Sequence, residues 1–307
     1  MIEILRAGPL ATVQDLGRET WRDRGISRCG ALDELALAWG NLLVGNGAGT
    51  AGLEFTLGPA TLRFHVDTCI AVTGTDADAS LDGRSLRPWW RQRVAAGQTL
   101  TLGAPRDRMR SYVAIAGGPA LAPMLGSLST DLKAGFGGFE GRALRDGDVL
   151  PLNTPTVLPS RAVGMRPPAF DAAVRVLAGP EHDDFSGASR DAFWAADWTV
   201  TPQSNRMGYR LAGPVLEREH GNELASHGVL PGVVQVPPSG QPIVLLVDAQ
   251  TTGGYPKIGV VIRADLWKLG QARLGGTLRF LPCTMDDARQ AWREQSLTLE
   301  QLKIALS

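Results

Sequence analysis

Glycine is the residue that most restricts the fold of this chain. It supplies 37 of the 307 residues, against an average usage of about 7%, and 20 prolines add to it. Both residues favour turns, because glycine accepts positive φ angles and proline interrupts helices and central strands. A chain that turns this often favours many short strands over long helices. The sequence therefore predicts a mainly β fold with a few short helices.

Short apolar runs bounded by Gly, Pro or Asp predict where the strands lie. They are Ile2–Ala7, Leu53–Leu57, Thr61–Val66, Cys69–Thr73, Thr99–Leu102, Tyr112–Ala116, Val174–Leu177, Trp198–Val200, Val233–Val236, Ile243–Val247, Ile258–Ile262 and Leu278–Leu281. Asp82-Gly83 predicts a type I′ hairpin, and Pro237–Gly240 predicts a second hairpin turn. A cassette of the form G-x-x-L-x-apolar begins at Gly97, Gly147 and Gly275, and predicts a tight turn that leads into a half-buried strand.

Only one segment of the first half has persuasive helical periodicity. Leu35, Ala38 and Leu42 form an apolar stripe that predicts a helix over Leu32–Val44, and the following Gly45-Asn46-Gly47 ends it.

The segment Leu152–Phe170 is the best domain boundary, because its four prolines block helix and central strand alike. From Asp286 onward the composition is helical and polar, and Thr298 with Gln301 suggests a capping box for a last turn or two. We therefore expect two β-rich domains, residues 1–160 and 161–283, and a helical tail over residues 284–307.

The charge balance and the cysteines exclude several classes of protein. Lys+Arg and Asp+Glu each number 31, so the chain lacks the basic footprint of a nucleic-acid-binding protein. No apolar run approaches the ~20 residues of a membrane helix, and the N-terminus lacks a secretory pattern. Three scattered cysteines predict neither a disulfide framework nor a zinc site. We expect a cytoplasmic protein with no nucleic-acid or membrane partner.

The densest group of polar residues follows a buried-looking strand that ends in Asp248. The strand opens onto a glycine-rich loop that runs to Lys257, and Gly253-Gly254 would let a ligand approach the backbone closely. The other residues of this stretch that we expect to bind substrate or nucleotide are Gln235, Gln250, Thr251, Thr252 and Tyr255. The alternative is a tight turn whose polar side chains satisfy its own backbone. The loop does not have the phosphate-loop pattern G-x-x-x-x-G-K-[ST].

A second candidate site lies in the segment Ser204-Asn205-Arg206. Arg206 and Arg210 are four residues apart and offer forked donors suited to a carboxylate or phosphate. The alternative is a solvated turn with Tyr209 and Leu211 packed beneath it.

The loops of the first half are also rich in hydrogen-bonding groups. Gln14, Asp15 and Arg18 either contact a ligand or, for Asp15 and Arg18, form a local ion pair. Asp33 either contributes to the same site or caps the helix that follows it. The glycine-rich cluster of Gly117-Gly118, Gly126–Thr130 and Gly135–Arg142 either holds a phosphate or nucleotide or lets two sheets approach each other.

Metal and nucleophile motifs are weak. The histidines lack the H-x-x-x-H and H-E-x-x-H spacings, so we expect no metal site. No G-x-S-x-G nucleophile elbow occurs. Cys29 lies beside Arg28, a setting that can activate a thiol, although a structural cysteine is the commoner outcome.

A set of motifs occurs in order along the chain and identifies a family. The motifs are T-V-Q-D-L-G-R, G-I-S-x-x-G-A-L-D, N-x-L-V-G-N with a following L-E, S-Y-x-A-x-A-G-G, L-G-S-x-S-T, G-R-x-L-x-x-G-D, S-N-R-M-G-Y-R-L, G-x-x-Q-V-P-P-x-G-Q-P-I-V-L-L and D-x-Q-T-T-G-G-Y-P-K-I. Together they resemble the KipA family, also called the 5-oxoprolinase C subunit (PxpC), from about residue 3 to residue 281. The same module occurs in the carboxyltransferase domain of urea carboxylase. One departure is Cys29, where the family more often has serine.

The resemblance implies a fold and partners that the strand pattern alone does not give. The implied fold is two tandem cyclophilin-like β-barrel subdomains. The implied direct partner is the 5-oxoprolinase B subunit, which is KipI-like. Together with the A subunit, the family members convert 5-oxoproline to glutamate at the expense of ATP. In urea carboxylase the related module transfers a biotin-carried carboxylate. This chain has no biotin-attachment lysine motif.

Three functions follow from this resemblance. The first is the C subunit of an ATP-dependent 5-oxoprolinase, in which Arg206, Arg210 and Lys257 hold anionic groups and Asp248 orients one of those cations. The second is a biotin-dependent carboxyltransferase. The third is a regulatory protein that binds and antagonises a KipI-like kinase inhibitor. Because no complete acid–base or metal set is visible in this chain, we expect a composite site with the KipI-like partner.

Overall fold

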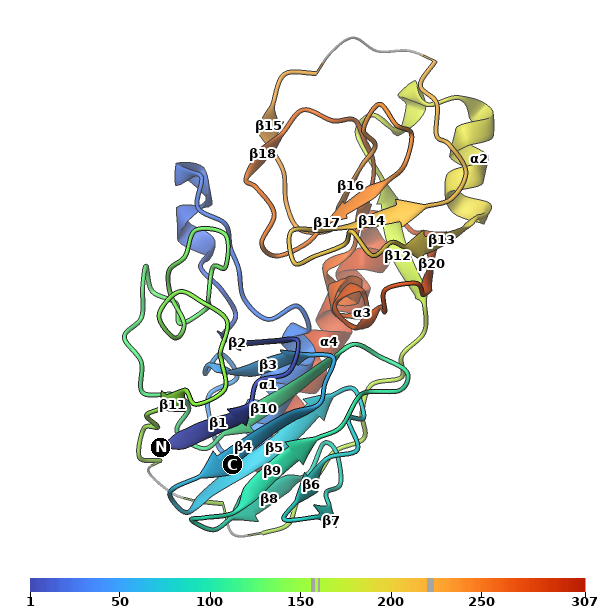
Figure 1. The fold of residues 1–307 in the computed structure, drawn as a ribbon. Coiled ribbons are helices and arrows are strands. Elements are labelled where there is room, and N and C mark those ends of the chain that lie inside the picture. Colours follow the sequence, from blue (N-terminus) through green and yellow to red (C-terminus); the bar gives the residue numbers. More distant parts are fainter. Residues whose placement is uncertain (156–157, 160, 220–223, 307) are drawn as a thin grey trace. The chain divides into compact units, whose positions relative to one another are not determined.

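The computed structural model describes residues 1–155, 158–159, 161–219 and 224–306, which form two compact units (Figure 1). The first unit consists of Met1–Arg18, Cys29–Ala169 and Leu299–Ser307, and the second of Glu19–Arg28 and Phe170–Thr298. Residue 160, the expected domain boundary, lies outside the described residues. The observed division differs from the expected one because each unit includes a segment from the other end of the chain.

The first unit contains two antiparallel sheets around one core. The six-stranded sheet has the order β11-β1-β4-β9-β6-β7, and the five-stranded sheet has the order β2-β3-β10-β5-β8. Their strands are β1 (Ile2–Arg6), β2 (Leu10–Gln14), β3 (Gly52–Thr56), β4 (Ala60–Phe64), β5 (Thr68–Gly74), β6 (Ser80–Leu81), β7 (Arg84–Ser85), β8 (Arg91–Val94), β9 (Thr99–Leu102), β10 (Arg110–Ile115) and β11 (Val149–Leu150). Ile4 and Phe64 of the first sheet share a buried cluster with Phe55 and Val113 of the second.

The first unit therefore consists of two packed antiparallel sheets that share one core. The chain passes from one sheet to the other at close backbone approaches. Gly8, with φ +75°, lies between β1 and β2, and a Cβ there would lie 2.8 Å from the carbonyl oxygen of Pro59. A Cβ on Gly58, between β3 and β4, would lie 2.3 Å from the carbonyl oxygen of Gly103. These glycine corners place consecutive strands in different sheets.

Helix α1 (Glu34–Leu43) covers the second face of the five-stranded sheet. Ala71 and Ala114 pack with Leu43 of the helix, whereas their neighbours Ile70 and Val113 face the shared core. Every residue of β5 and β10 is buried for this reason. The predicted helix is confirmed, with Asp33 as its N-cap and Gly45 after its end.

The predicted turns are confirmed as well. Asp82 and Gly83 have φ angles of 47° and 78°, as a type I′ turn requires, and they join β6 to β7. Gly97, Gly147 and Gly275 have φ angles of 91°, 88° and 79°. Each of these three glycines precedes a strand whose cassette leucine is buried: Leu100, Leu150 and Leu278.

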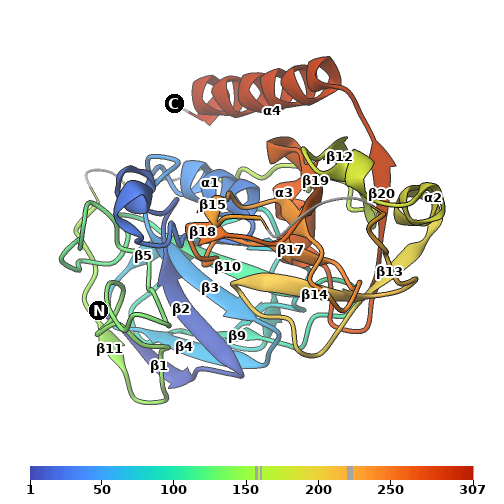
Figure 2. The ribbon, with the colours of Figure 1, turned by 90° about the horizontal axis from the view of Figure 1, so that it is seen from above.

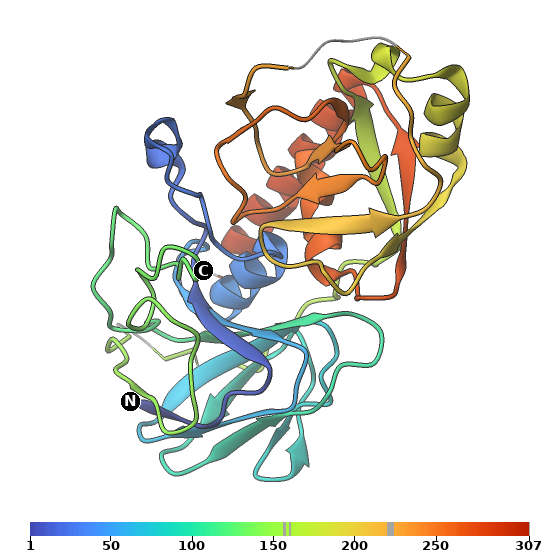
Figure 3. The same ribbon diagram turned by 45° about the horizontal axis from the view of Figure 1, so that its top comes forward.

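The second unit is a closed barrel with the strand order β12-β19-β16-β17-β14-β13-β20 (Figure 3). The strands are β12 (Ala173–Ala178), β13 (Asp197–Val200), β14 (Gly208–Ala212), β16 (Val233–Gln235), β17 (Ile243–Leu245), β19 (Lys257–Val261) and β20 (Thr277–Pro282). A parallel pairing of β12 with β20 closes the ring, and the other pairings are antiparallel. The mainly β prediction is therefore confirmed.

Shorter elements surround the barrel. They are the 3₁₀ segments η1 (Glu19–Arg24), η2 (His182–Asp184) and η3 (Arg263–Asp265), the helices α2 (Gly187–Ala195) and α3 (Leu266–Gln271), and the two-stranded ribbon of β15 (His227–Gly228) and β18 (Thr252–Gly253). The sequence analysis did not predict α2, which Ser186 caps by accepting a hydrogen bond from the Ser189 N–H at 3.2 Å. Phe193 of α2 packs on Phe280 of β20, with ring centroids 4.9 Å apart.

Helix α4 (Met285–Leu306) is uninterrupted, as Figure 2 shows. The capping box predicted at Thr298 and Gln301 is wrong, because Thr298 lies inside α4 and its hydroxyl donates to the Glu294 carbonyl oxygen at 2.9 Å. The cap lies instead at Thr284, whose Oγ1 accepts from the Asp287 N–H while the Asp287 carboxylate accepts from the Thr284 N–H. None of the helices in the described residues is long and apolar enough to cross a membrane.

The N-cap of α1 gives a stability prediction. Asp33 Oδ1 accepts from the Ala36 N–H at 2.8 Å, so Asp33→Ala should lower the free energy of unfolding by about 0.5–2 kcal/mol. Asp33→Asn keeps an acceptor oxygen at the cap and should lose less than half of that amount. Urea unfolding of the three proteins measures the difference. An equal loss in both variants would show that the charge of Asp33, and not its capping, stabilises the helix.

Candidate functional site

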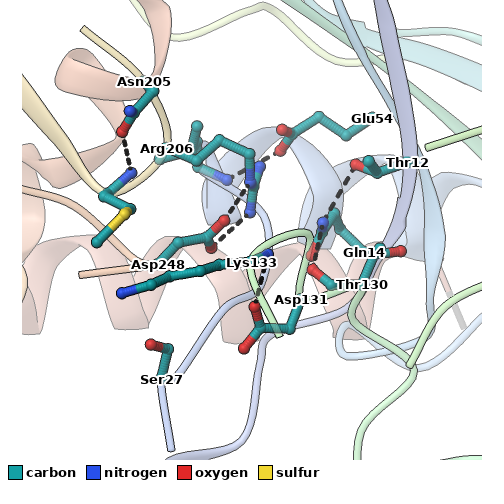
Figure 4. Close-up of polar contacts among 12 residues, drawn as sticks. Thr12, Gln14, Ser27, Glu54, Thr130, Asp131, Lys133, Asn205, Arg206 and Asp248 are labelled. Carbon is teal, nitrogen blue, oxygen red and sulfur yellow. Dashed lines mark hydrogen bonds and ion pairs between the residues drawn. The ribbon is translucent and has the colours of Figure 1, made fainter. Parts of the chain in front are cut away.

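Arg206 and Asp248 form a buried ion pair with two hydrogen bonds (Figure 4). Arg206 Nε donates to Asp248 Oδ2 at 2.9 Å and Nη2 donates to Oδ1 at 3.1 Å. Arg206 lies in the turn before β14, and Asp248 follows β17, the neighbouring strand. The two backbones stay joined beyond the strands, because the Asp248 N–H donates to the Arg206 carbonyl oxygen at 3.2 Å. Asp248 therefore holds the Arg206 guanidinium in one orientation.

Lys257 forms a second buried ion pair, with Glu181. Lys257 Nζ lies 3.1 Å from Glu181 Oε2, and the two side chains are 5% and 15% exposed. The Lys257 N–H donates to the same oxygen at 2.9 Å. The exit from β12 passes directly over β19, since a Cβ on Gly179 would lie 2.1 Å from the Lys257 carbonyl oxygen. That close approach fixes the carboxylate on the lysine.

Gln235 lies opposite Lys257 in the register of β16 and β19. The register shifts at this point and leaves Ile258 without a partner in β16, which is a β-bulge of the kind often found beside functional sites. The Gln235 side chain is 2% exposed, and within the described residues its Nε2 has no acceptor. A Cβ on Gly253 would lie 2.6 Å from that nitrogen, so the backbone of β18 closely approaches the Gln235 amide.

We call Glu181, Gln235, Gly253 and Lys257 the Lys257 cluster. It combines an ammonium group, an amide donor without an acceptor and a carboxylate at one end of the barrel. Preorganised donors of this kind stabilise negative charge that develops on a substrate oxygen, and they do so best where water is excluded. A carboxylate held beside them can accept a proton.

A pocket of about 910 Å³ lies beside the loop that leads into Lys257. Its lining includes Gly254, Tyr255 and Pro256 of that loop, together with Val236–Pro238 and Leu216–Arg218. Tyr255 is 47% exposed, and its carbonyl oxygen accepts from Lys257 Nζ at 3.3 Å. The pocket therefore places a mixed apolar and charged surface next to the Lys257 cluster.

Several predicted binding residues have structural partners instead. Ser204 Oγ accepts from the Arg210 N–H at 3.0 Å, and Asn205 Oδ1 accepts from the Met207 N–H at 2.8 Å. Arg210 is exposed on β14, whereas its neighbour Tyr209 is buried in the barrel. The two arginines therefore do not form the joint fork that their spacing suggests.

The glycine-rich loop is fixed by backbone pairing. Thr252 and Gly253 form β18 and pair with β15, and the Thr251 carbonyl oxygen accepts from the Val229 N–H at 2.9 Å. Gln250 is exposed. The tip of this loop is therefore held by backbone pairing with residues 227–229, and the candidate chemistry lies at Lys257.

A buried polar network fixes the loop before α1. Tyr112 OH donates to Glu54 Oε2 at 2.7 Å and accepts from the Asp33 N–H at 2.8 Å. Burial, aided by the Glu54 charge, raises the pKa of Tyr112, so the phenol keeps its proton. Cys29 in this loop is fully buried, and Arg28 pairs with Glu19. These contacts favour a structural cysteine.

The expected local pair of Asp15 with Arg18 does not form. Asp15 accepts from the hydroxyls of Ser127 and Ser129 and from the Leu128 N–H, so it fixes the turn of the L-G-S-x-S-T motif. Gln14 Nε2 donates to Thr12 Oγ1 at 3.1 Å and to the Thr130 carbonyl oxygen at 3.3 Å. Within the part of the chain that the structure describes, no group of three His, Cys, Asp or Glu residues could hold a metal ion.

Sequence reasoning missed Glu181, which pairs with Lys257. It lies 76 residues away along the chain, in a turn that carries no recognised motif. Its one local signal is the Gly179-Pro180 turn that ends a predicted strand. Only the pairing of β12 with β19 brings the two residues together.

Comparisons with known proteins agree with this architecture. Residues 24–282 match the family described as carboxyltransferase domain, subdomain A and B. The chain is 50% identical to the 5-oxoprolinase C subunit of Escherichia coli, over 98% of this chain and 97% of that protein. It is 43% identical to the 5-oxoprolinase C subunit of Haemophilus influenzae, over 99% and 98% of the two chains.

Larger proteins contain a similar unit. The crystal structure of the Kluyveromyces lactis urea amidolyase matches with a TM-score of 0.91 at 29% identity. That match covers 98% of this chain and 20% of the amidolyase, so this chain spans about a fifth of that protein.

The Arg206–Asp248 pair gives a prediction on stability. Asp248→Ala removes the counter-charge and two hydrogen bonds of a buried arginine, and should lower the free energy of unfolding by about 3–5 kcal/mol. The double variant Arg206→Met with Asp248→Leu should recover most of that loss, because no charge remains buried. Urea unfolding measures both. The control is Asp197→Ala in the exposed pair with Arg279, which should change stability by less than about 0.5 kcal/mol. Additive losses in the double variant would contradict the prediction.

Proposed function

The chain belongs to the family of the 5-oxoprolinase C subunit, which carries a carboxyltransferase domain, and on this premise we propose that it serves as the C subunit of an ATP-dependent 5-oxoprolinase. In this proposal it works with the A and B subunits to convert 5-oxo-L-proline to L-glutamate, with ATP as co-substrate of the complex. The observation that carries the proposal is the match over nearly the full length of both chains.

The reaction needs an activated amide. A lactam is stabilised by amide resonance, so water attacks it readily only after its oxygen has been activated. In the proposed sequence the lactam oxygen receives a phosphoryl group from ATP. Water then adds to the carbon, the C–N bond breaks, and glutamate, ADP and phosphate are released. Negative charge develops on oxygen atoms at each stage.

The Lys257 cluster supplies the groups that such charge requires. The ammonium of Lys257 and the amide of Gln235 are buried donors, and Glu181 fixes the position of the lysine. Asp248 holds the Arg206 guanidinium in one orientation through two hydrogen bonds. We assign these residues to stabilising an anionic substrate or intermediate.

We propose further that the catalytic surface is composite and formed with the KipI-like B subunit. The support is chemical: the described residues offer donors and paired carboxylates but no metal cluster and no nucleotide loop. A partner that covers the pocket beside Tyr255 would exclude water and strengthen the contacts of the donors. The A subunit is then the functional partner that completes the reaction.

Carboxyl transfer is the second candidate function. The observation that favours it is the same fold in a urea amidolyase, over nearly all of this chain. Under this function the chain would receive a carboxylate from biotin on a separate carrier, and the same donors would hold it. Carboxylation of an acceptor with a cognate biotin carrier would support this function, and glutamate formation without biotin would exclude it.

The main proposal is tested by reconstitution. The A and B subunits and this chain are mixed with 5-oxoproline and ATP, and glutamate and ADP are measured with and without this chain. We expect glutamate formation to depend on its presence. Equal rates without it would overturn the proposal, and binding to the KipI-like partner without any effect on rate would favour the regulatory function.

Lys257 gives the prediction on catalysis. Lys257→Ala should lower the turnover of the complex by about a hundredfold, as the loss of one preorganised donor does. Size-exclusion chromatography should still show assembly with the KipI-like partner, since one buried cationic tip adds little to a large interface.

The matched control is Lys268→Ala. Lys268 is also a largely buried lysine of the second unit, paired with Asp171 at 2.7 Å, and its loss should leave turnover near normal. Normal turnover in an assembled Lys257→Ala complex would remove Lys257 from the catalytic site.

A further inference from the structure

Arg18 is a buried cation without a counter-charge. Its side chain is 2% exposed, and Nη2 donates to the carbonyl oxygen of Ser129. Its guanidinium carbon lies 4.8 Å from the centre of the Phe136 ring. Among the described residues, Nε and Nη1 have no hydrogen-bond acceptor, and no carboxylate forms an ion pair with this arginine. Of its acidic neighbours in sequence, Glu19 pairs with Arg28, and Asp15 accepts hydrogen bonds from Ser127, Leu128 and Ser129.

Gln14 provides a complementary group on the same stretch of chain. Its side chain is fully buried, and its Nε2 donates to the carbonyl oxygen of Thr130, the residue after the one that Arg18 contacts (Figure 4). Its Oε1 is buried and has no donor among the described residues. Arg18 therefore offers unused N–H groups, and Gln14 offers an unused acceptor, both anchored to consecutive carbonyl groups.

A glycine loop packs against these residues. A Cβ on Gly137 would lie 2.3 Å from the Ser129 carbonyl oxygen and 2.9 Å from Arg18 Nη2. A Cβ on Gly138 would lie 1.9 Å from Thr130 Oγ1. The loop therefore requires glycine at both positions, and it brings Phe136 over the guanidinium. Phe136 is the side chain that a ligand of Arg18 would displace.

Such an arrangement is unfavourable for stability unless a ligand completes it. A buried charge without a partner destabilises a fold, and proteins retain such groups mainly where function needs them. Arg206 and Lys257 are also buried cations, and each of them has a carboxylate. Arg18 has no carboxylate beside it, and an anionic ligand would supply that counter-charge.

We propose that Arg18 and Gln14 bind a small carboxylate that also carries an N–H donor, with the carboxylate on Arg18 and the N–H on Gln14 Oε1. The identity of the ligand rests on the proposed function, because 5-oxoproline and glutamate both combine these two groups. The site lies in the first unit and shares no residue with the Lys257 cluster. It is a binding and specificity site and takes no part in bond breaking.

The test compares 5-oxo-L-proline with 5-oxo-L-prolinamide, which has the same ring but no charge. Binding to the purified full chain is measured by calorimetry, and kcat/KM is measured for the reconstituted complex. The acid should bind more tightly than the amide by about tenfold or more, as a charge-assisted contact requires. Arg18→Met and Arg18→Lys should bring this ratio close to one. The control is Arg63→Met, which removes an exposed arginine from the same unit and should leave the ratio unchanged.

Thermal unfolding separates binding from a structural role. Because Arg18 is a buried charge without a counter-charge, Arg18→Met should not lower the Tm of the free chain, and 5-oxoproline should raise the Tm of wild type but not that of the variant. An unchanged acid-to-amide ratio in Arg18→Met would overturn the proposal. Inorganic phosphate is the third probe. If equimolar phosphate displaces 5-oxoproline from wild type, and phosphate no longer binds to Arg18→Met, the site is a phosphate site. That result would overturn the proposal that its ligand is a carboxylate.

The two proposals can fail separately. If the complex forms glutamate and the ratio survives Arg18→Met, the function stands and this site does not. If the chain binds the acid through Arg18 and the complete complex forms no glutamate, the site stands and the function does not. If neither the chain nor the complex binds the acid, both are overturned.

Discussion

Closure of the seven-stranded barrel is the constraint on which the candidate site depends. β20 pairs with β13 on one side and, in parallel, with β12 on the other, so the sheet has no free edge. A closed sheet fixes the register of every strand, since a slip in one pair would have to pass around the whole ring. Glu181, Gln235 and Lys257 follow or belong to β12, β16 and β19, which are neighbours in that ring. Their proximity is thus a property of the closed sheet.

Local chemistry predicted much of the fold. Some features depend on only a few neighbouring residues, and these could be predicted from residue type. They are the positive-φ glycines, the Asp82-Gly83 turn and the Asp33 cap. The same holds for alternating apolar runs such as β9. The two-sheet form of the first unit was not predictable in this way, because it depends on glycine corners that approach distant backbone. The position of the α4 cap was misjudged because Thr284 and Thr298 both fit a capping pattern. The structure distinguishes them, since α4 begins directly after Thr284 and continues through Thr298.

The site was predictable in part. Asp248 and Arg206 belong to polar segments that follow and precede strands, and the structure brings them together as a buried ion pair. Glu181 could not be inferred, since a carboxylate 76 residues from Lys257 has no periodic or motif signal. Arg210 was over-interpreted, because a spacing of four brings side chains together on a helix but not in a turn that leads into a strand.

The exchange of segments between the two units bears on how the chain folds during synthesis. Glu19–Arg28 belong to the second unit, where Ser27 Oγ donates to the Ala249 carbonyl oxygen at 3.2 Å, and Leu299 and Leu302 belong to the first. The second unit is therefore complete only when Thr298 has left the ribosome, and the first only when the last turns of α4 have followed, although the N-terminal strands emerge early. Domains usually fold one after another as they are made. Here Glu19–Arg28 contact residues that are synthesised more than 200 positions later. The two units therefore finish folding together, late in synthesis and through contacts between residues far apart in the sequence.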